Sequence, residues 1–198
     1  MNQASDAIPR PRRPARSWPQ PLRPRVVGVA GGAGVTTLAA ALGGQDCGVF
    51  PGSAGVGGVD VLVCHGTRDM IHRASTAVDQ LLRAERHRPV VAVVLGQRAP
   101  DRVAHERLRL IAPYAARIVF VPQVKRWARA DAPLDEARAL PGIPDGALPR
   151  HLHAFAGAVS DIREALAHRQ PVSRSARPAP GRAVSPRRAS RPTPQRSR

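Results

Sequence analysis

The chain has 198 residues and a formal net charge of +17, with 31 Lys and Arg residues against 14 Asp and Glu residues. No stretch approaches the ~18 consecutive apolar residues of a membrane-spanning helix, and the Pro- and Arg-rich N-terminus lacks the apolar core of a signal peptide. These properties argue against a transmembrane or secreted protein, so we expect a cytoplasmic one.

The basic charge is concentrated at the two ends of the chain. Residues 1–25 carry six Arg and one acidic residue, residues 168–198 carry nine Arg and no acidic residue, and each segment holds six of the 21 prolines. Such segments bury too little apolar surface to offset the entropy of ordering the chain. We therefore predict a disordered Pro/Arg-rich tail at 1–24, one α/β domain at 25–168, and a disordered Arg/Pro/Ser-rich tail at 169–198.

The central domain alternates predicted strands with predicted helices. Branched apolar runs are typical of buried strands, and apolar residues recurring every three or four positions are typical of helices. This alternation favours a parallel, Rossmann-like sheet with helices on both faces. In chain order we predict a strand that starts at Arg25, a helix at Thr36–Leu42, a loop at 43–58 with at most one short strand near Gly48–Phe50, a strand at Val59–Cys64, a helix at about Arg68–His87, a strand at Val90–Leu95, a helix at Asp101–Ala112, a strand at Arg117–Val121 and a helix at about Ala147–His168.

A glycine-rich turn joins the first strand to the first helix, with the sequence A-G-G-A-G-V-T-T at 30–37. A catalytic phosphate-binding loop, G-x-x-x-x-G-K-[ST], cradles phosphates with backbone N–H groups, contacts them with its lysine and holds Mg²⁺ with its hydroxyl. Val35 occupies the position of that lysine, whereas Thr36 keeps the hydroxyl and is a Mg²⁺ ligand if nucleotide binds. Two interpretations follow, a structural turn and a nucleotide- or phosphate-binding loop formed by Gly31, Gly32, Ala33, Gly34, Val35, Thr36 and Thr37.

This segment resembles the deviant phosphate loop of the MinD/ParA family of P-loop ATPases, K-G-G-x-G-K-[ST]-[ST]. The resemblance extends to Val59–Thr67, similar to the family's late strand and following turn, and to Val121–Leu134, similar to its base-recognition loop. It implies a P-loop fold, ATP or ADP with Mg²⁺ as cofactor, and a homodimer. A protein without a cofactor is the alternative.

The chain departs from the family at the positions that carry catalysis. Ala30 and Val35 replace the family's two lysines, and Gly96 replaces its adenine-contacting Asn. Asp46 and Asp60 are the acidic residues near the loop, but Asp60 begins its strand and is a poor Mg²⁺ ligand. Because ligands bind at the carboxyl ends of parallel strands, we name four candidate replacement cations there: Arg68, Arg98, Lys125 and Arg126.

These observations leave three hypotheses for the function. The first is a non-hydrolysing MinD/ParA-like protein that serves, with unidentified protein partners, as an accessory or regulatory component of a bacterial partition, positioning, conjugation or secretion assembly. The second is a nucleotide-dependent ATPase that uses a replacement cation. The third is a nonspecific nucleic-acid-binding protein that acts through its Arg-rich tails. Cys47 and Cys64 show no metal-binding spacing, which predicts buried free thiols.

Overall fold

The computed structural model describes residues 23–51, 58–84, 88–96 and 99–168. Most of the predicted tail at 1–24 and all of the predicted tail at 169–198 lie outside these residues, as does the predicted helical end at 85–87. Within the described residues, none of the helices combines the length and the apolar character that a membrane span requires.

Five parallel strands form one sheet with the order β2-β1-β3-β4-β5. The predicted parallel α/β fold is therefore confirmed. The strands are β1 (Arg25–Gly28), β2 (Gln45–Val49), β3 (Val61–His65), β4 (Val90–Leu95) and β5 (Arg117–Pro122).

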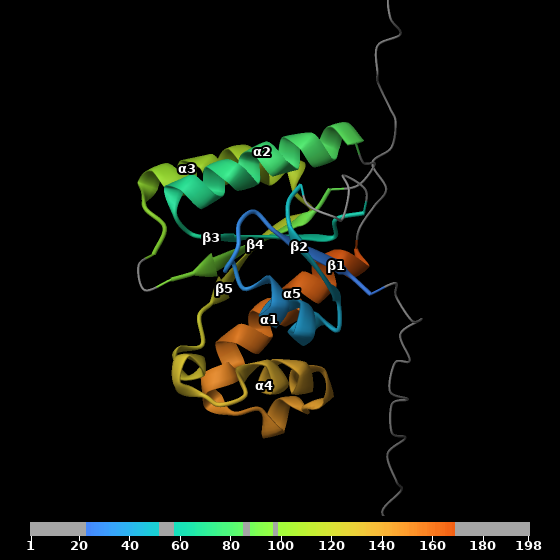
Figure 1. Ribbon diagram of the computed structural model, residues 1–198, viewed down its shortest axis with the longest axis vertical. Coiled ribbons are helices and arrows are strands. Elements are labelled where there is room, and N and C mark those ends of the chain that lie inside the picture. The colour runs from blue at the N-terminus through green and yellow to red at the C-terminus, as the bar shows by residue number, and fades with distance from the viewer. Residues whose placement is uncertain (1–22, 52–57, 85–87, 97–98, 169–198) are drawn as a thin grey trace, which may run out of the picture.

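Helices cover both faces of this sheet (Figure 1). One face carries α2 (Arg68–Ala84) and α3 (Arg102–Ile111), and the other carries α1 (Val35–Leu42), α4 (Pro133–Ala139) and α5 (His153–Ala167).

Each face has its own apolar core because successive side chains of a strand point to opposite faces. In β3, Val61 and Val63 pack with the cluster under α1 and α5, whereas Leu62 and Cys64 pack with the cluster under α2 and α3. The three central strands are buried on both faces, which explains their nearly continuous apolar sequences.

The structure differs from the sequence-based expectations in three places. The loop predicted at 43–58 contains β2, which starts three residues before the short strand expected near Gly48–Phe50. Helix α4 was not predicted at all. The last helix starts at His153 instead of about Ala147, because Pro149 disfavours helical backbone in the residue before it.

Two short 3₁₀ segments, at Asp145–Ala147 and Arg150–Leu152, replace the expected first turns of the last helix. Leu152 is still buried and Leu148 still packs against the core, so the apolar stripe predicted from the sequence faces the sheet as expected.

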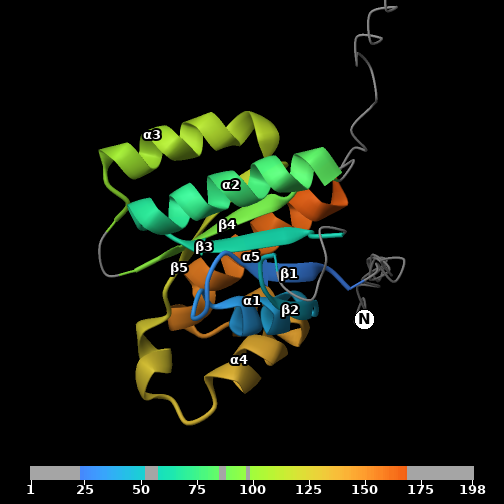
Figure 2. The same cartoon turned by 45° about the horizontal axis from the view of Figure 1, so that its top comes forward.

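The carboxyl ends of the strands meet at one edge of the sheet. Figure 2 shows the blue loop after β1, the end of β4 and the segment after β5 at this edge. This is the edge where open parallel sheets bind ligands.

Candidate functional site at the glycine loop

The backbone of the glycine loop has the shape expected of a helix start that receives an anion. Gly32 and Gly34 have left-handed backbone with φ of 74° and 85°. Gly34 is the N-cap of α1 but supplies no side-chain hydrogen bond, and the first turn of α1 contains no acidic residue. The first N–H groups of a helix lack intrahelical partners and carry partial positive charge, a combination that attracts anions.

Val35 lies in the hydrophobic core, with 8% of its surface exposed. A Cβ atom added to Gly28 would lie 2.6 Å from a Val35 methyl carbon, which shows that Val35 packs directly over the end of β1. The position of the phosphate-binding lysine is therefore occupied by an aliphatic side chain that points into the protein, and it supplies no positive charge.

The hydroxyl of Thr36, the predicted Mg²⁺ ligand, is hydrogen-bonded to a carboxylate. Thr36 Oγ1 donates to Asp46 Oδ2 at 2.6 Å, and the other oxygen of Asp46 accepts from the Gly48 N–H at 2.9 Å. Strand β2 brings Asp46 to this position. The hydroxyl and the carboxylate together place a negative charge, not a positive one, beside the start of α1.

His65 is the third side chain at the loop, and sequence reasoning did not assign it a role there. It ends β3, and its Nε2 lies 3.0 Å from the Gly32 carbonyl oxygen. Since a carbonyl only accepts hydrogen bonds, Nε2 carries the proton and donates it to the loop. The available signal was its position, directly after a buried strand at the ligand-binding edge of the sheet.

Asp60 lies away from this site, as the sequence predicted. Its carboxylate accepts a hydrogen bond from the Arg25 N–H at 2.7 Å, at the amino ends of β1 and β3. This is the opposite edge of the sheet from the glycine loop, which follows the carboxyl end of β1.

Among the candidate replacement cations, Arg68 is directed toward α3. Its Nε donates to Asp101, the N-cap of α3, whose carboxylate also accepts from the Ala104 N–H at 2.9 Å. The Ala104 hydrogen bond first, and then the Arg68 guanidinium, hold the pKa of Asp101 below its ordinary value. Arg68 thus joins the starts of α2 and α3. Of the other candidates, Arg98 lies outside the described residues.

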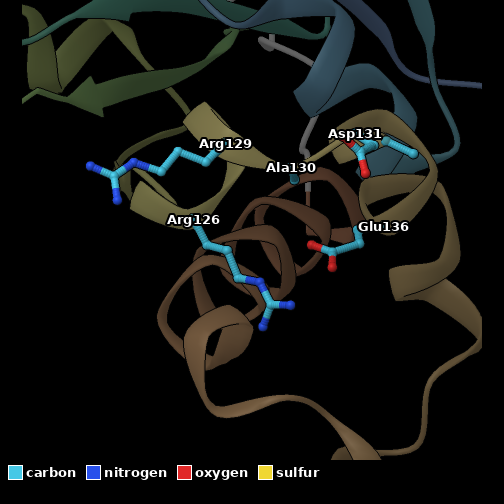
Figure 3. A pocket seen from close by; sticks show the side chains of 6 residues that line it. Arg126, Arg129, Ala130, Asp131 and Glu136 are labelled. Atoms are coloured by element: carbon cyan, nitrogen blue, oxygen red, sulfur yellow. The ribbon is translucent and has the colours of Figure 1, made fainter.

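The other two candidates, Lys125 and Arg126, are exposed residues of a 3₁₀ segment at Lys125–Arg129. Arg126 lines a hollow of about 480 Å³, drawn in Figure 3, where the Arg129 side chain extends away from Glu136. The glycine loop contributes no residue to this hollow. The lining residues are Arg126, Arg129, Ala130, Asp131, Ala132 and Glu136.

Glu136 anchors one wall of this hollow. The Trp127 Nε1–H donates to Glu136 Oε2 at 2.6 Å, and His151 Nε2 lies 3.6 Å from the same oxygen. These contacts, the Trp127 hydrogen bond foremost, lower the pKa of Glu136. Trp127 also packs edge-on against Phe155 of α5, with ring centroids 4.9 Å apart, so the segment after β5 is fastened to the core.

The arrangement fits a Mg²⁺-nucleotide only in part. Thr36 and Asp46 are oxygen donors of the kind that Mg²⁺ accepts, but the described residues contain no group of three His, Cys, Asp or Glu side chains able to hold a metal.

Both cysteines are free, and burial raises the pKa of the Cys64 thiol to about 12, whereas Cys47 is only half-buried.

Comparison with known proteins gives no relative for this chain. No protein-family model, no curated protein and no solved structure matches it. The function therefore has to be inferred from the geometry of the loop and its neighbours.

Proposed function

We propose that the chain is a degenerate MinD/ParA-like P-loop protein that does not hydrolyse ATP and acts as an accessory or regulatory component of a bacterial partition, positioning, conjugation or secretion assembly. The observation that carries the proposal is Val35, which takes the position of the catalytic lysine and is buried against Gly28. The type of assembly is named from the family resemblance alone.

Phosphoryl transfer depends on positive groups that neutralise the charge developing on the transferred phosphate. At this loop, the described side chains that make hydrogen bonds are the hydroxyl of Thr36, the carboxylate of Asp46 and the imidazole of His65. The Arg68 guanidinium is paired with Asp101 instead. Loss of a hydrogen bond to a charged group costs roughly 1.5–3 kcal/mol, so a missing lysine alone weakens nucleotide binding at least tenfold.

The backbone N–H groups at the start of α1 would give the loop a role that does not require turnover. An anion at the start of α1 would meet free N–H groups. We therefore propose that any nucleotide, ATP or ADP, acts at this loop only as a weakly bound ligand that changes the stability of the fold.

The test combines an assay of phosphate release with a binding titration on the full chain. With Mg-ATP we expect no phosphate release above the buffer rate, both for the wild type and for Thr36→Ala. A thermal-shift titration with ATP and ADP, with and without Mg²⁺, reports binding because a ligand of the native state raises its stability. Thr37→Ala is the matched control for the loss of a threonine hydroxyl.

Phosphate release that Thr36→Ala abolishes and Thr37→Ala leaves would contradict the proposal. That result would support the second hypothesis, an ATPase with a replacement cation. Substitution of Lys125 or Arg126 with Ala, one at a time, would then identify the cation by loss of turnover.

A further inference from the structure

Strand β5 forms one border of the sheet, and the described residues contain no strand beyond it. After Arg117 its sequence is Ile-Val-Phe-Val-Pro, without a charged residue. An apolar strand with an open edge is a template for pairing with another chain, and natural proteins normally protect such edges.

The opposite border of the sheet is protected. Strand β2 contains Asp46 and Gly48, its residues are mostly exposed, and its pairing with β1 shifts register between Val26 and Gly28. A charge and an irregular pairing are two of the usual devices that prevent edge-to-edge association. Strand β5 pairs regularly with β4 along its whole length, and its one charged residue, Arg117, stands at its start, so the edge from Ile118 to Val121 has neither device.

The backbone of β5 shows which groups are directed outward. The Ala116 N–H donates to the Pro89 carbonyl at 2.9 Å, and β4 and β5 pair in parallel with Val90 opposite Arg117. In a parallel ladder alternate residues of an edge strand bond to the neighbouring strand. Since the Ala116 N–H points toward β4, Ile118 and Phe120 also bond to β4. The N–H and C=O groups that point away from β4, at the open edge, therefore belong to Arg117, Val119 and Val121.

The side chains of β5 and its neighbours divide into an apolar part and two charged ends. Phe120 is 41% exposed and lies beside His105 of α3, with ring centroids 6.1 Å apart, and Ile118 packs on the same face. At the start of β5, on the α5 face, Arg117 pairs with Glu164 at 2.8 Å and with Asp161 at 3.5 Å, which leaves one negative charge in excess. At the far end, basic residues follow the strand: Lys125, Arg126 and Arg129.

We propose that two copies of this chain associate through β5, which pairs antiparallel with the β5 strand of the partner about a two-fold axis at Val119. The pairing gives a continuous sheet of ten strands. In this register Val119 lies opposite the partner's Val119, and Arg117 lies opposite the partner's Val121. These three pairs use all the outward N–H and C=O groups of Arg117, Val119 and Val121.

The side chains fit this antiparallel pairing better than a parallel one. Phe120 lies opposite the partner's Ile118, so the apolar side chains on the α3 face cover each other. On the α5 face, antiparallel pairing brings the acidic end of one copy, with Asp161 and Glu164, toward the basic segment at 125–129 of the other. The two short strands alone bury less than the roughly 1,200–2,000 Å² of a stable interface, so the contacts between the acidic and basic segments are needed to enlarge it.

Sedimentation velocity of the full chain over a concentration series tests the dimer. We expect a concentration-dependent dimer, and we expect Phe120→Lys to weaken it by about tenfold or more, because it places an ammonium group opposite the partner's Ile118. Leu110→Lys is the matched control, since Leu110 is 72% exposed on α3 and should leave the dimer unchanged. Phe120 is itself exposed, so the folded monomer should tolerate its replacement, as circular dichroism would verify.

A disulfide trap tests the register. In a Cys47→Ser background, Ile118→Cys combined with Phe120→Cys should give a covalent dimer on oxidation, because opposed residues of an antiparallel pair bring their Cβ atoms within ~4.5–5.5 Å. Neither Ile118→Cys alone nor Phe120→Cys alone should give a covalent dimer on oxidation. A monomer at all concentrations, or a dimer that Phe120→Lys leaves intact, would overturn the proposal, and crosslinking through Phe120→Cys alone would overturn the Val119 register.

Discussion

At the scale of single residues, Val35 decides which side-chain chemistry the glycine loop offers. A lysine there would extend its ammonium group toward a bound phosphate. Valine has no group to extend, and its methyl groups pack against Gly28 in the core. Val35 therefore contributes to the stability of the domain, and the backbone N–H groups at the start of α1 are what the loop offers an anion.

The contact between Val35 and Gly28 can be measured by a double-mutant cycle. Gly28→Ala should cost about 1–3 kcal/mol, because its new Cβ would lie 2.6 Å from the Val35 methyl carbon and 3.0 Å from the Ala30 carbonyl oxygen. Val35→Ala should cost about 1.5 kcal/mol from the two methylene equivalents removed. In the double variant the loss should be smaller than the sum, as measured by urea unfolding.

Gly31→Ala is the control for this cycle, because a Cβ atom at Gly31 would meet nothing within 4 Å. It should leave the free energy of unfolding nearly unchanged. Strictly additive losses for Gly28→Ala and Val35→Ala would show that Val35 does not pack over Gly28.

Residues at the loop differ in how far the sequence could predict their environment. That valine stands where a catalytic phosphate loop would have its lysine is visible in the sequence itself, because the spacing of Gly31, Gly34 and Thr36 defines the position. The Thr36–Asp46 hydrogen bond is not visible, because it depends on β2 pairing with β1 and returning Asp46 to the loop. Likewise, the contact from His65 to Gly32 depends on β1 and β3 being neighbours in the sheet.

At the scale of elements, the buried strands were the most predictable part of the fold. The strand predicted at Val90–Leu95 is β4 with the same bounds, because its run of branched residues is buried between two helix layers. The edge strand β2 was harder to predict, since it is exposed and contains Gly48, and α4 has only seven residues, the first of which is Pro133. Short elements of this kind are fixed by tertiary contacts more than by local sequence.

The start of α3 illustrates how an element boundary is held by one carboxylate. Asp101 caps the helix and pairs with Arg68 at the start of α2. We expect Asp101→Ala to lower the melting temperature more than Asp101→Asn, because asparagine keeps the cap but loses the charge. Asp79→Asn, which removes an exposed pair with Arg83 inside α2, is the matched control and should change less.

The same carboxylate gives a pH dependence whose sign follows from its lowered pKa. The pKa of Asp101 lies below its ordinary value of 3.8 in the folded chain, so its contribution to stability is present above that value and is lost as the pH falls through the lowered pKa. The difference in melting temperature between wild type and Asp101→Asn should therefore be constant near neutral pH and shrink below about pH 3.8. A difference that grows on acidification would contradict this assignment.

At the scale of the whole molecule, most of the net positive charge lies in the segments that flank the α/β domain. Residues 26–167 hold 16 basic and 13 acidic residues, a net charge of +3, whereas the flanking segments carry +5 and +9 of the total of +17. Polyanions bind such segments through counterion release, which does not require a shaped site. We therefore expect polyanion binding to depend on the flanking segments and the stability of the fold to depend on residues 26–167. Deletion of the flanking segments tests both expectations.

Deletion of residues 1–24 and 169–198 should abolish retention of the chain on heparin and binding to single-stranded RNA, while leaving the melting temperature of the domain nearly unchanged. Replacement of the nine Arg residues of 169–198 with Lys is the control, because it keeps the charge and should keep most of the binding. In the full chain we expect the logarithm of the binding constant to fall linearly with the logarithm of salt concentration. Undiminished binding by the truncated chain would place the polyanion site on the folded domain, where the exposed basic residues after β5 would be the first to examine, and would contradict a role for the tails.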